Sequence, residues 1–416
     1  MLLYIHVPFC RGKCRYCAFY SEPLDTGFGD GPRRVRAYLD VIRLEMSQWA
    51  DRLGRRRVES VFFGGGTPSL LPAKAVGSIL DQARRCFDVA EGAEITLESN
   101  PDSLASPALA RDYLRAGVNR ISLGFQALDE NLLALLGRPH SAQDAVRACY
   151  AAREAGCANL SLDLMWGLPG QKVAQWKAAL REIVKLRPDH ISAYGLSLEP
   201  GTPLAEDCEN GLLILPPEQD QAAMYLDGAA LLEEAGLMQY EISNFARMGY
   251  QCRHNLGYWE GAEYLGLGPA ATSTIMARRW TNPADLNLWG RMITAKRIPD
   301  EIEQLDARAR LLELLMLRLR TVRGLRVKAY RDLTGRDFLK DHQRLVRALH
   351  RKGLVRIRNG YFSLTRGGML VSDSILAAFF DAAKAMLGDA TPKRDDCPAG
   401  EPQGPERASS LQDQPS

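Results

Sequence analysis

The sequence predicts an α/β fold in which a parallel sheet covered by helices is followed by a smaller helical unit. Short apolar runs that are typical of strands alternate with longer amphipathic stretches over residues 1–200. Most of these runs are apolar at consecutive positions, as in strands that are buried on both faces of a parallel sheet. Six such units form either an open sheet or part of a barrel, and in both cases ligands bind at the carboxyl ends of the strands.

The strands and helices of this first part are expected in strict alternation. The expected strands span residues 2–7, 60–66, 94–99, 120–125, 159–167 and 190–197. The expected helices span residues 35–49, 73–87, 107–116, 142–156 and 173–186. From about Glu206 the alternation breaks down. A helix is expected at 216–237, followed by an aromatic, loop-rich segment at 240–261 and a segment rich in glycine and small residues at 263–275.

The C-terminal part is expected to fold as a separate compact unit. Helices at 305–320, 325–333 and 339–352 precede two short strands joined at Asn359-Gly360, a dipeptide that is typical of two-residue hairpin turns. Helices followed by a hairpin resemble a winged helix. Residues 389–416 offer little apolar surface to bury, so we expect a disordered tail there. The expected domains are a first domain at 1–205, its extension at 206–302, the helical domain at 303–388 and the tail at 389–416.

Composition excludes several classes of protein. The chain has 416 residues, of which 46% are hydrophobic and 25% are charged, as in ordinary globular proteins. A formal net charge of +3 does not predict a nucleic-acid partner, and no apolar run approaches the roughly 20 residues that span a bilayer. The N-terminus lacks a secretion signal, and six of the nine cysteines are scattered singly. We therefore expect a cytoplasmic protein without an integral membrane segment.

Three cysteines lie close together directly after the first expected strand. Cys10, Cys14 and Cys17 form a C-x3-C-x2-C pattern. Buried structural thiols are one interpretation, although arginine and lysine interleave the cysteines. A zinc site is a second, but zinc usually takes a fourth cysteine or histidine, and His6 is the only neighbour. The third is a [4Fe-4S] cluster bound at three irons, which leaves the fourth iron open for a small ligand.

This cysteine pattern, together with "GGGTPS" at 64–69, resembles the signatures of the radical S-adenosylmethionine (radical SAM) superfamily. The resemblance implies a partial (βα)6 radical-SAM barrel, a [4Fe-4S] cluster on the three cysteines, and S-adenosyl-L-methionine bound to the open iron. It also implies that Gly65, Gly66 and Thr67 meet the methionyl end of the cofactor. Glycines there would let the backbone approach a charged ligand closely.

Further cofactor contacts are implied by the same resemblance, in several cases at the ends of expected strands. Asp163 is the most telling, because a carboxylate inside the apolar run "LSLDLMWG" is costly without a partner or a ligand. The implied S-adenosyl-L-methionine contacts are Tyr4, Tyr16, Glu98, Gln126, Arg138 and Asp163.

The segments "YIHVPFC", "ISLGFQ" and "DLMWGLPGQ" resemble the superfamily branch related to oxygen-independent coproporphyrinogen III oxidase, from Tyr4 to about residue 380. Those oxidases carry an additional cysteine two residues after the third cluster ligand, where this chain has Phe19. The segment "HNLGYW" at 254–259 instead resembles a motif of the HemW-type haem chaperones. This implies haem contact by His254, Asn255, Tyr258 and Trp259, and delivery of haem to respiratory haem proteins.

From the residues alone, "HNLGYW" has two interpretations. His254 can ligate haem iron, and the aromatic side chains can stack on a flat macrocycle. The plainer interpretation is a loop that packs two aromatic residues at the barrel, with His254 as a hydrogen-bond donor. The sequence thus favours a haem chaperone with client haem proteins and leaves the radical SAM oxidative decarboxylase of porphyrin biosynthesis as the alternative. It assigns no catalytic residue. A basic stretch at 340–360 is more typical of a solvated helix face than of a nucleic-acid site.

Overall fold

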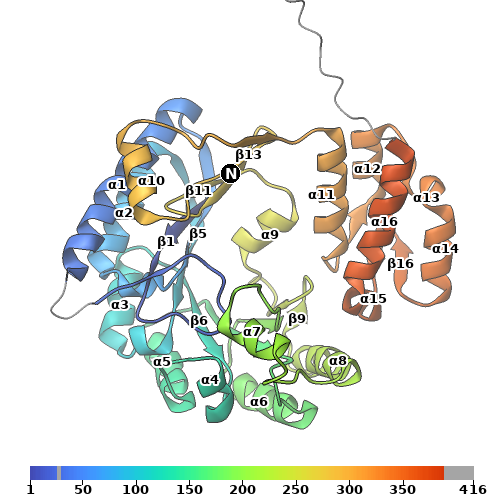
Figure 1. Cartoon of the computed structure of the whole chain (residues 1–416), viewed down its shortest axis with the longest axis horizontal. Helices are drawn as coiled ribbons and strands as arrows, with labels where there is room; N and C mark the ends of the chain where they lie inside the picture. Colours follow the sequence, from blue (N-terminus) through green and yellow to red (C-terminus); the bar gives the residue numbers. More distant parts are fainter. Residues whose placement is uncertain (26–29, 388–416) are drawn as a thin grey trace, which may run out of the picture.

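The structure of the chain is a computed structural model that describes residues 1–25 and 30–387. The disordered tail predicted at 389–416 lies outside the described residues. The chain forms a twelve-stranded sheet, most of it curled into a partial barrel, beside a smaller helical unit (Figure 1). No helix in the described ranges is long and apolar enough to cross a bilayer.

Six parallel strands, neighbours in chain order, form the main part of the barrel. They are β1 (Leu2–Val7), β4 (Arg57–Gly65), β5 (Asp88–Ser99), β6 (Arg120–Gln126), β7 (Leu160–Trp166) and β8 (His190–Gly195). The helices that cover their outer face are α1 (Gly31–Leu53), α2 (Ala73–Cys86), α3 (Pro107–Arg115), α5 (Ala142–Glu154) and α6 (Val173–Lys185). The α/β fold with a partial (βα)6 barrel is therefore confirmed, because each predicted strand and helix overlaps an observed one.

The sheet continues beyond the six predicted strands at both edges. Next to β1 it adds β11 (Tyr264–Leu267) in parallel, then β12 (Thr272–Ile275), β13 (Arg278–Thr281) and β14 (Ile302–Gln304) in antiparallel pairing. Next to β8 it adds β10 (Asn244–Ala246) and β9 (Met238–Gln239). The barrel part also contains β2 (Phe9–Cys10), β3 (Glu22–Pro23), α4 (Glu130–Leu135), α7 (Pro203–Glu209), the longer helix α8 (Glu218–Glu234) and α10 (Leu286–Thr294).

The segment predicted as loop-rich at 240–261 contains a helix, α9 (Arg253–Trp259), which corrects the prediction. Its first turn is held by the buried carboxylate of Glu94 on β5, which accepts hydrogen bonds from the Arg253 and His254 amides at 3.0 and 3.1 Å and from the Cys252 thiol at 3.3 Å. A carboxylate at this end satisfies amides that have no partner within the helix. Figure 1 shows α9 inside the curve of the sheet, facing the helical unit.

The helical unit has an apolar core of its own, centred on Phe338, Phe362 and Phe379. Asn359 and Gly360 both have positive φ, as the predicted two-residue hairpin turn requires. The elements of this unit are α11 (Ala307–Leu319), β15 (Leu325–Arg326), α12 (Val327–Thr334), α13 (Phe338–Asp341), α14 (Gln343–Arg351), β16 (Val355–Arg358), β17 (Tyr361–Leu364), α15 (Arg366–Leu370) and α16 (Ser372–Leu387). Of these, β15, α15 and α16 were not predicted, and the helix predicted at 339–352 is divided into α13 and α14. The domain boundaries stay a prediction.

Candidate functional site

The three cysteines lie on a loop, here called the cysteine loop (residues 8–20), that leaves the carboxyl end of β1. Backbone hydrogen bonds fix this loop at both ends. The Gly66 and Thr67 amides donate to the Val7 and Phe9 carbonyls at 2.8 and 2.7 Å, and the Arg15 amide donates to the Leu136 carbonyl at 3.1 Å. Cys10, Cys14 and Cys17 are all partly exposed free thiols, and burial raises the pKa of Cys17. The loop therefore presents its sulfurs at the mouth of the barrel.

The glycine run at the end of β4 is explained by the closeness of β1 and the cysteine loop. A Cβ at Gly65 would lie 2.6 Å from the His6 ring, and Gly65 has a φ of +105°. A Cβ at Gly66 would lie 2.5 Å from the Phe9 carbonyl oxygen. The amide of Gly66 is bonded to the Val7 carbonyl, so only its carbonyl group is left for a ligand, and the expected cofactor contact of Gly66 stays a prediction. In this structure the glycines first of all hold the cysteine loop.

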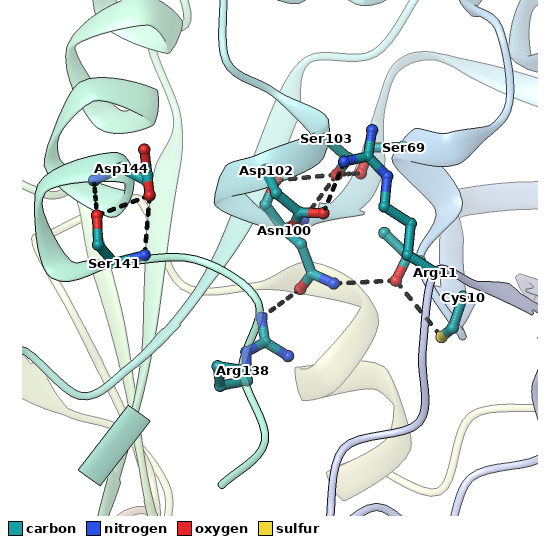
Figure 2. A network of polar contacts seen from close by, with 10 residues as sticks. Cys10, Arg11, Ser69, Asn100, Asp102, Ser103, Arg138, Ser141 and Asp144 are labelled. Atoms are coloured by element: carbon teal, nitrogen blue, oxygen red, sulfur yellow. Dashed lines mark hydrogen bonds and ion pairs between the residues drawn. The ribbon is translucent and has the colours of Figure 1, made fainter. Parts of the chain in front are cut away.

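A polar network joins the cysteines to the ends of β4, β5 and β6. The Arg138 guanidinium donates to the Cys14 sulfur at 3.4 Å and to Asn100 Oδ1 at 2.6 Å. Asn100 Nδ2 donates to Thr67 Oγ1 at 3.0 Å, which lies 3.5 Å from the Cys10 sulfur. Figure 2 shows Asn100 between Arg138 and Cys10. The structure thus brings two predicted cofactor residues, Arg138 and Thr67, against the predicted cluster ligands. Asn100 was missed, although it directly follows a strand end.

The three thiols of the loop are donors of the kind that an iron–sulfur cluster takes. Within residues 1–25 and 30–387, no three cysteine, histidine or acidic side chains lie close enough to hold one metal ion. Thiolates on a single Zn²⁺ with bonds of about 2.3 Å would lie about 4 Å apart, whereas a four-iron cluster binds each thiolate at a different iron. The [4Fe-4S] cluster on these cysteines stays a prediction.

Gln126 and Tyr16, also predicted to contact the cofactor, lie next to this network. Gln126 has a φ of +60° at an irregularity in the β6–β7 pairing that starts at Gly124. A Cβ at Gly124 would lie 2.9 Å from Gln126 Nε2, 3.1 Å from Asn100 Oδ1 and 3.3 Å from Arg138 Nη2. Gly124 therefore leaves the space in which these three side chains meet. Tyr16 packs against a small apolar cluster behind the loop, and burial raises its pKa.

The lumen of the barrel contains a partly open cavity of about 130 Å³. Six of the predicted site residues line it: Tyr4, Glu98, Asp163, His254, Asn255 and Tyr258. Arg120, His190 and Tyr240 line it as well and were not predicted. Trp259 is not among the lining residues. The structure thus joins residues assigned to S-adenosyl-L-methionine and residues assigned to haem in one small chamber.

Two carboxyl groups in the lumen are stabilised in different ways. Burial raises the pKa of Glu98 to about 8, and the charge of Asp163 adds to the effect, while a hydrogen bond from the Gly65 amide opposes it. Burial also raises the pKa of Asp163, but hydroxyl groups oppose that shift. Ser122 donates to Asp163 at 2.8 Å and Ser161 at 3.1 Å. Near neutral pH we therefore expect Glu98 to be largely protonated.

Glu98→Gln is expected to flatten the dependence of stability on pH. Because the folded-state pKa of Glu98 lies above its ordinary value of 4.5, the folded protein holds a proton that the unfolded chain releases. The contribution of Glu98 to the free energy of unfolding is fully present below about pH 4.5 and is lost as the pH rises toward 8. The variant should be more stable than wild type at pH 8, by on the order of 2–4 kcal/mol. Anaerobic urea denaturation from pH 5 to 8 measures this.

The matched control for this prediction is Glu59→Gln, because Glu59 lies exposed on β4. That variant should keep the wild-type pH dependence. Equal slopes in Glu98→Gln and wild type between pH 5 and 8 would contradict the assignment of a raised pKa to Glu98.

His254 is buried, with both ring nitrogens hydrogen-bonded. Nδ1 lies 2.8 Å from Ser60 Oγ and Nε2 lies 3.1 Å from Tyr258 Oη. Burial lowers the pKa of His254 to about 3, so the imidazole is neutral. Neutral imidazole is the form that binds iron, but neither nitrogen is free in this structure. Ligation of iron by His254 stays a prediction and would require breaking one of these two hydrogen bonds.

A chain of hydrogen bonds connects α9 to Asp163 across the lumen. Ser161 donates to Asp163, so its oxygen must accept from His190 Nδ1, which lies 2.9 Å away. Burial keeps His190 neutral by lowering its pKa, so Nε2 accepts from the Tyr240 hydroxyl at 2.8 Å. Asn255 in turn donates to Tyr240 at 3.3 Å. Every hydrogen bond in this chain is donated in the direction of Asp163. A change in the charge of Asp163 would therefore alter the strength of the hydrogen bond that Asn255 donates to Tyr240.

Comparison with known proteins agrees with this geometry. The model of the radical SAM superfamily matches residues 4–183, and the model of the HemN C-terminal domain matches residues 305–371. The heme chaperone HemW of Bacillus subtilis is 32% identical over 90% of this chain and 98% of its own length. The mitochondrial radical S-adenosyl methionine domain-containing protein 1 of Bos taurus is 35% identical over 94% of this chain and 89% of its own length.

The solved structures include one close match in fold. The coproporphyrinogen III oxidase HemN of Escherichia coli aligns with a TM-score of 0.77 over 91% of this chain and 89% of its own, at 21% identity. At that identity the match shows the shared fold only. One conclusion follows from the cysteine loop, the glycine run and the two relatives, which align along nearly their whole length. The chain belongs to the radical SAM superfamily and, within it, to the family of HemW and its mitochondrial relatives.

Proposed function

We propose that this protein is a haem chaperone that binds haem, a [4Fe-4S] cluster and S-adenosyl-L-methionine, and delivers haem to client haem proteins, including respiratory ones. The observation that carries the proposal is the similarity to a protein named as a heme chaperone over 98% of that protein's length. The presence of "HNLGYW" as helix α9 at the barrel lumen supports it from the structure. We place the protein in the cytoplasm, because the six cysteines outside the cysteine loop are scattered rather than paired.

The cluster would be held by Cys10, Cys14 and Cys17. Arg138 beside Cys14 and Thr67 beside Cys10 would then act as outer partners that offset charge and orient the thiolates. When bound, such a cluster together with S-adenosyl-L-methionine supplies one-electron chemistry. The cofactor would occupy the barrel mouth between the cysteine loop and the lumen, in contact with Tyr4, Tyr16, Gly65, Gly66, Thr67, Glu98, Gln126, Arg138 and Asp163.

Haem would contact α9 through His254, Asn255, Tyr258 and Trp259. The lumen cavity of about 130 Å³ is smaller than the roughly 300–1,000 Å³ of pockets that bury drug-sized ligands, so a haem does not fit inside it. Asn255, Tyr258 and Trp259 are partly exposed, whereas His254 is 2% exposed. Contact between haem and His254 would therefore require α9 to move, and contact with Trp259 would not by itself require entry into the lumen.

His254→Ala is expected to lower stability by about 2–4 kcal/mol, because it leaves Ser60 and Tyr258 without a buried partner and opens a cavity. If His254 ligates iron, the variant should also shift the Soret band of bound haem. Urea denaturation and haem titration measure the two effects separately. His350→Ala, at an exposed histidine on α14, is the control and should change neither. An unchanged Soret band in a folded His254→Ala protein would exclude axial ligation by His254.

The alternative function is oxidative decarboxylation of coproporphyrinogen III. Phe19, which is 68% exposed, stands where the oxidases carry their additional cysteine, and this disfavours the alternative. The deciding experiment gives the cluster-loaded protein both haem and coproporphyrinogen III with a reductant and S-adenosyl-L-methionine. Haem binding without decarboxylated product supports the chaperone, whereas product without haem binding would replace it with the enzyme.

A further inference from the structure

Arg120, at the start of β6, is a buried arginine whose side chain lines the barrel lumen. The residue is 2% exposed and lines the cavity. Among the residues that the structure describes, none accepts a hydrogen bond from its Nε, and no acidic side chain forms an ion pair with it. A guanidinium has five donors that must be satisfied when it leaves water. A buried arginine with unpaired donors lowers the stability of the folded protein unless a bound ligand accepts hydrogen bonds from it.

Two carboxyl groups, those of Glu94 and Asp163, stabilise the charged form of Arg120 electrostatically. Both already accept hydrogen bonds from other residues. Glu94 accepts from the first turn of α9, through Arg253, His254 and Cys252. Asp163 accepts from Ser122 and Ser161. These carboxylates offset the charge of Arg120 at a distance, but they are held where they are by their own hydrogen bonds. The guanidinium therefore keeps N–H groups that can donate hydrogen bonds to the oxygen atoms of a ligand.

The rest of the cavity wall favours a small anion of single charge. Among the described residues, no other arginine or lysine lines it, and burial keeps His190 and His254 neutral by lowering their pKa values. A single guanidinium can balance one negative charge, and the carboxyl group of Asp163 in the same wall disfavours a doubly charged phosphate or sulfate. The volume of about 130 Å³ is close to that of an engineered cavity of about 150 Å³ that holds benzene, so a few heavy atoms fit.

We propose that the barrel lumen is a binding site for one carboxylate group, held by the guanidinium of Arg120. The planar fork of an arginine matches the two oxygens of a carboxylate and can bond both. The carboxylate belongs either to a small free acid or to a short acidic arm of a larger ligand whose body stays outside the lumen. The second source includes a haem propionate and rests on the proposed haem-binding function; the site on Arg120 does not.

The first test is made on the wild-type, cluster-loaded full chain under anaerobic conditions. Sodium acetate is titrated against sodium chloride at constant ionic strength, and the Arg120 Nε–H resonance, assigned by its absence in Arg120→Lys, is followed by nitrogen-15 NMR. A saturable shift of that resonance is expected, because no residue in the described part of the chain accepts a hydrogen bond from this Nε–H. Arg57→Lys, at an exposed arginine on β4, is the matched control and should keep the shift. An acetate titration that leaves the Arg120 resonance unmoved counts against a small free acid.

The second test distinguishes the source. Haem and haem dimethyl ester, which lacks free carboxylates, are titrated into wild type and Arg120→Lys. Weaker binding of haem, by about tenfold, in Arg120→Lys with unchanged binding of the ester would assign the site to a propionate arm. If wild type and Arg120→Lys bind haem with equal affinity, and acetate still shifts the Arg120 resonance saturably, the site would be assigned to a small free acid. If acetate causes no saturable shift and haem affinity is independent of Arg120, the proposal is overturned, even where wild type binds haem.

Discussion

Cys14→Ser is expected to abolish the iron–sulfur cluster while leaving the fold intact. The loop around Cys14 is held by backbone hydrogen bonds from Arg15 to Leu136 and from Leu204 to Arg15, at 3.1 and 2.9 Å, and neither involves the sulfur. A serine hydroxyl is a far weaker iron ligand than a thiolate, and two thiolates do not hold a four-iron cluster. After anaerobic reconstitution, iron and acid-labile sulfide per chain should fall to background, together with the visible absorbance of the cluster.

Cys208→Ser is the matched control, because Cys208 is a partly exposed free thiol on the neighbouring helix α7. It should load a full cluster. Circular dichroism of Cys14→Ser should match that of wild type. The assignment of the three cysteines fails if Cys14→Ser retains iron and sulfide at the wild-type level, or if Cys208→Ser loses them equally.

Gly66→Ala is expected to destabilise the protein by about 3 kcal/mol and to prevent cluster loading. The new Cβ would lie 2.5 Å from the Phe9 carbonyl oxygen and 2.9 Å from the Val7 carbonyl oxygen. Both contacts are with backbone, so relief requires β1 and the cysteine loop to move away from β4. That movement would break the 2.8 Å hydrogen bond from Gly66 to Val7 and displace Cys10. Urea denaturation of the cluster-free protein and iron analysis after reconstitution measure the two effects.

Gly12→Ala tests whether any substitution in this region has the same result. Gly12 lies on the cysteine loop, and a Cβ there would meet nothing within 4 Å. We expect wild-type stability to within about 0.5 kcal/mol and normal cluster loading. Should Gly66→Ala load its cluster as well as Gly12→Ala does, the glycine run is not what holds the cysteine loop.

The barrel could be predicted because its elements are determined locally. Strands such as Leu2–Val7 are apolar at nearly every position, and the helices between them have one apolar face, so the two periods separate clearly. Helix α9 could not be predicted in this way. "HNLGYW" contains few strong helix formers, and its first turn is held by Glu94, which is 160 residues away from His254 in sequence. Its existence depends on the tertiary structure.

The cluster ligands were predicted from a pattern in the sequence. The spacing of Cys10, Cys14 and Cys17 left buried thiols, zinc and a cluster open, and the glycine run at 64–69 added the resemblance that implies a cluster. Asn100 and Arg120 belong to no such sequence pattern. A polar residue beside a strand looks the same in sequence whether it faces solvent or the lumen. Arg120 and Asp163 lie on the neighbouring strands β6 and β7, and the curvature of the sheet brings Tyr4 on β1 to the same cavity. The coupling from Asn255 through Tyr240 and His190 to Asp163 likewise depends on the tertiary structure of the partial barrel.

The most direct test is the quantification of iron, acid-labile sulfide and haem on one anaerobically reconstituted sample of the full chain. We expect iron and sulfide in the proportions of a [4Fe-4S] cluster and haem that titrates to saturation on the same molecules. A sample that takes up haem but no sulfide would show that the protein does not carry the cluster. A sample that carries the cluster and binds no haem would contradict the chaperone function.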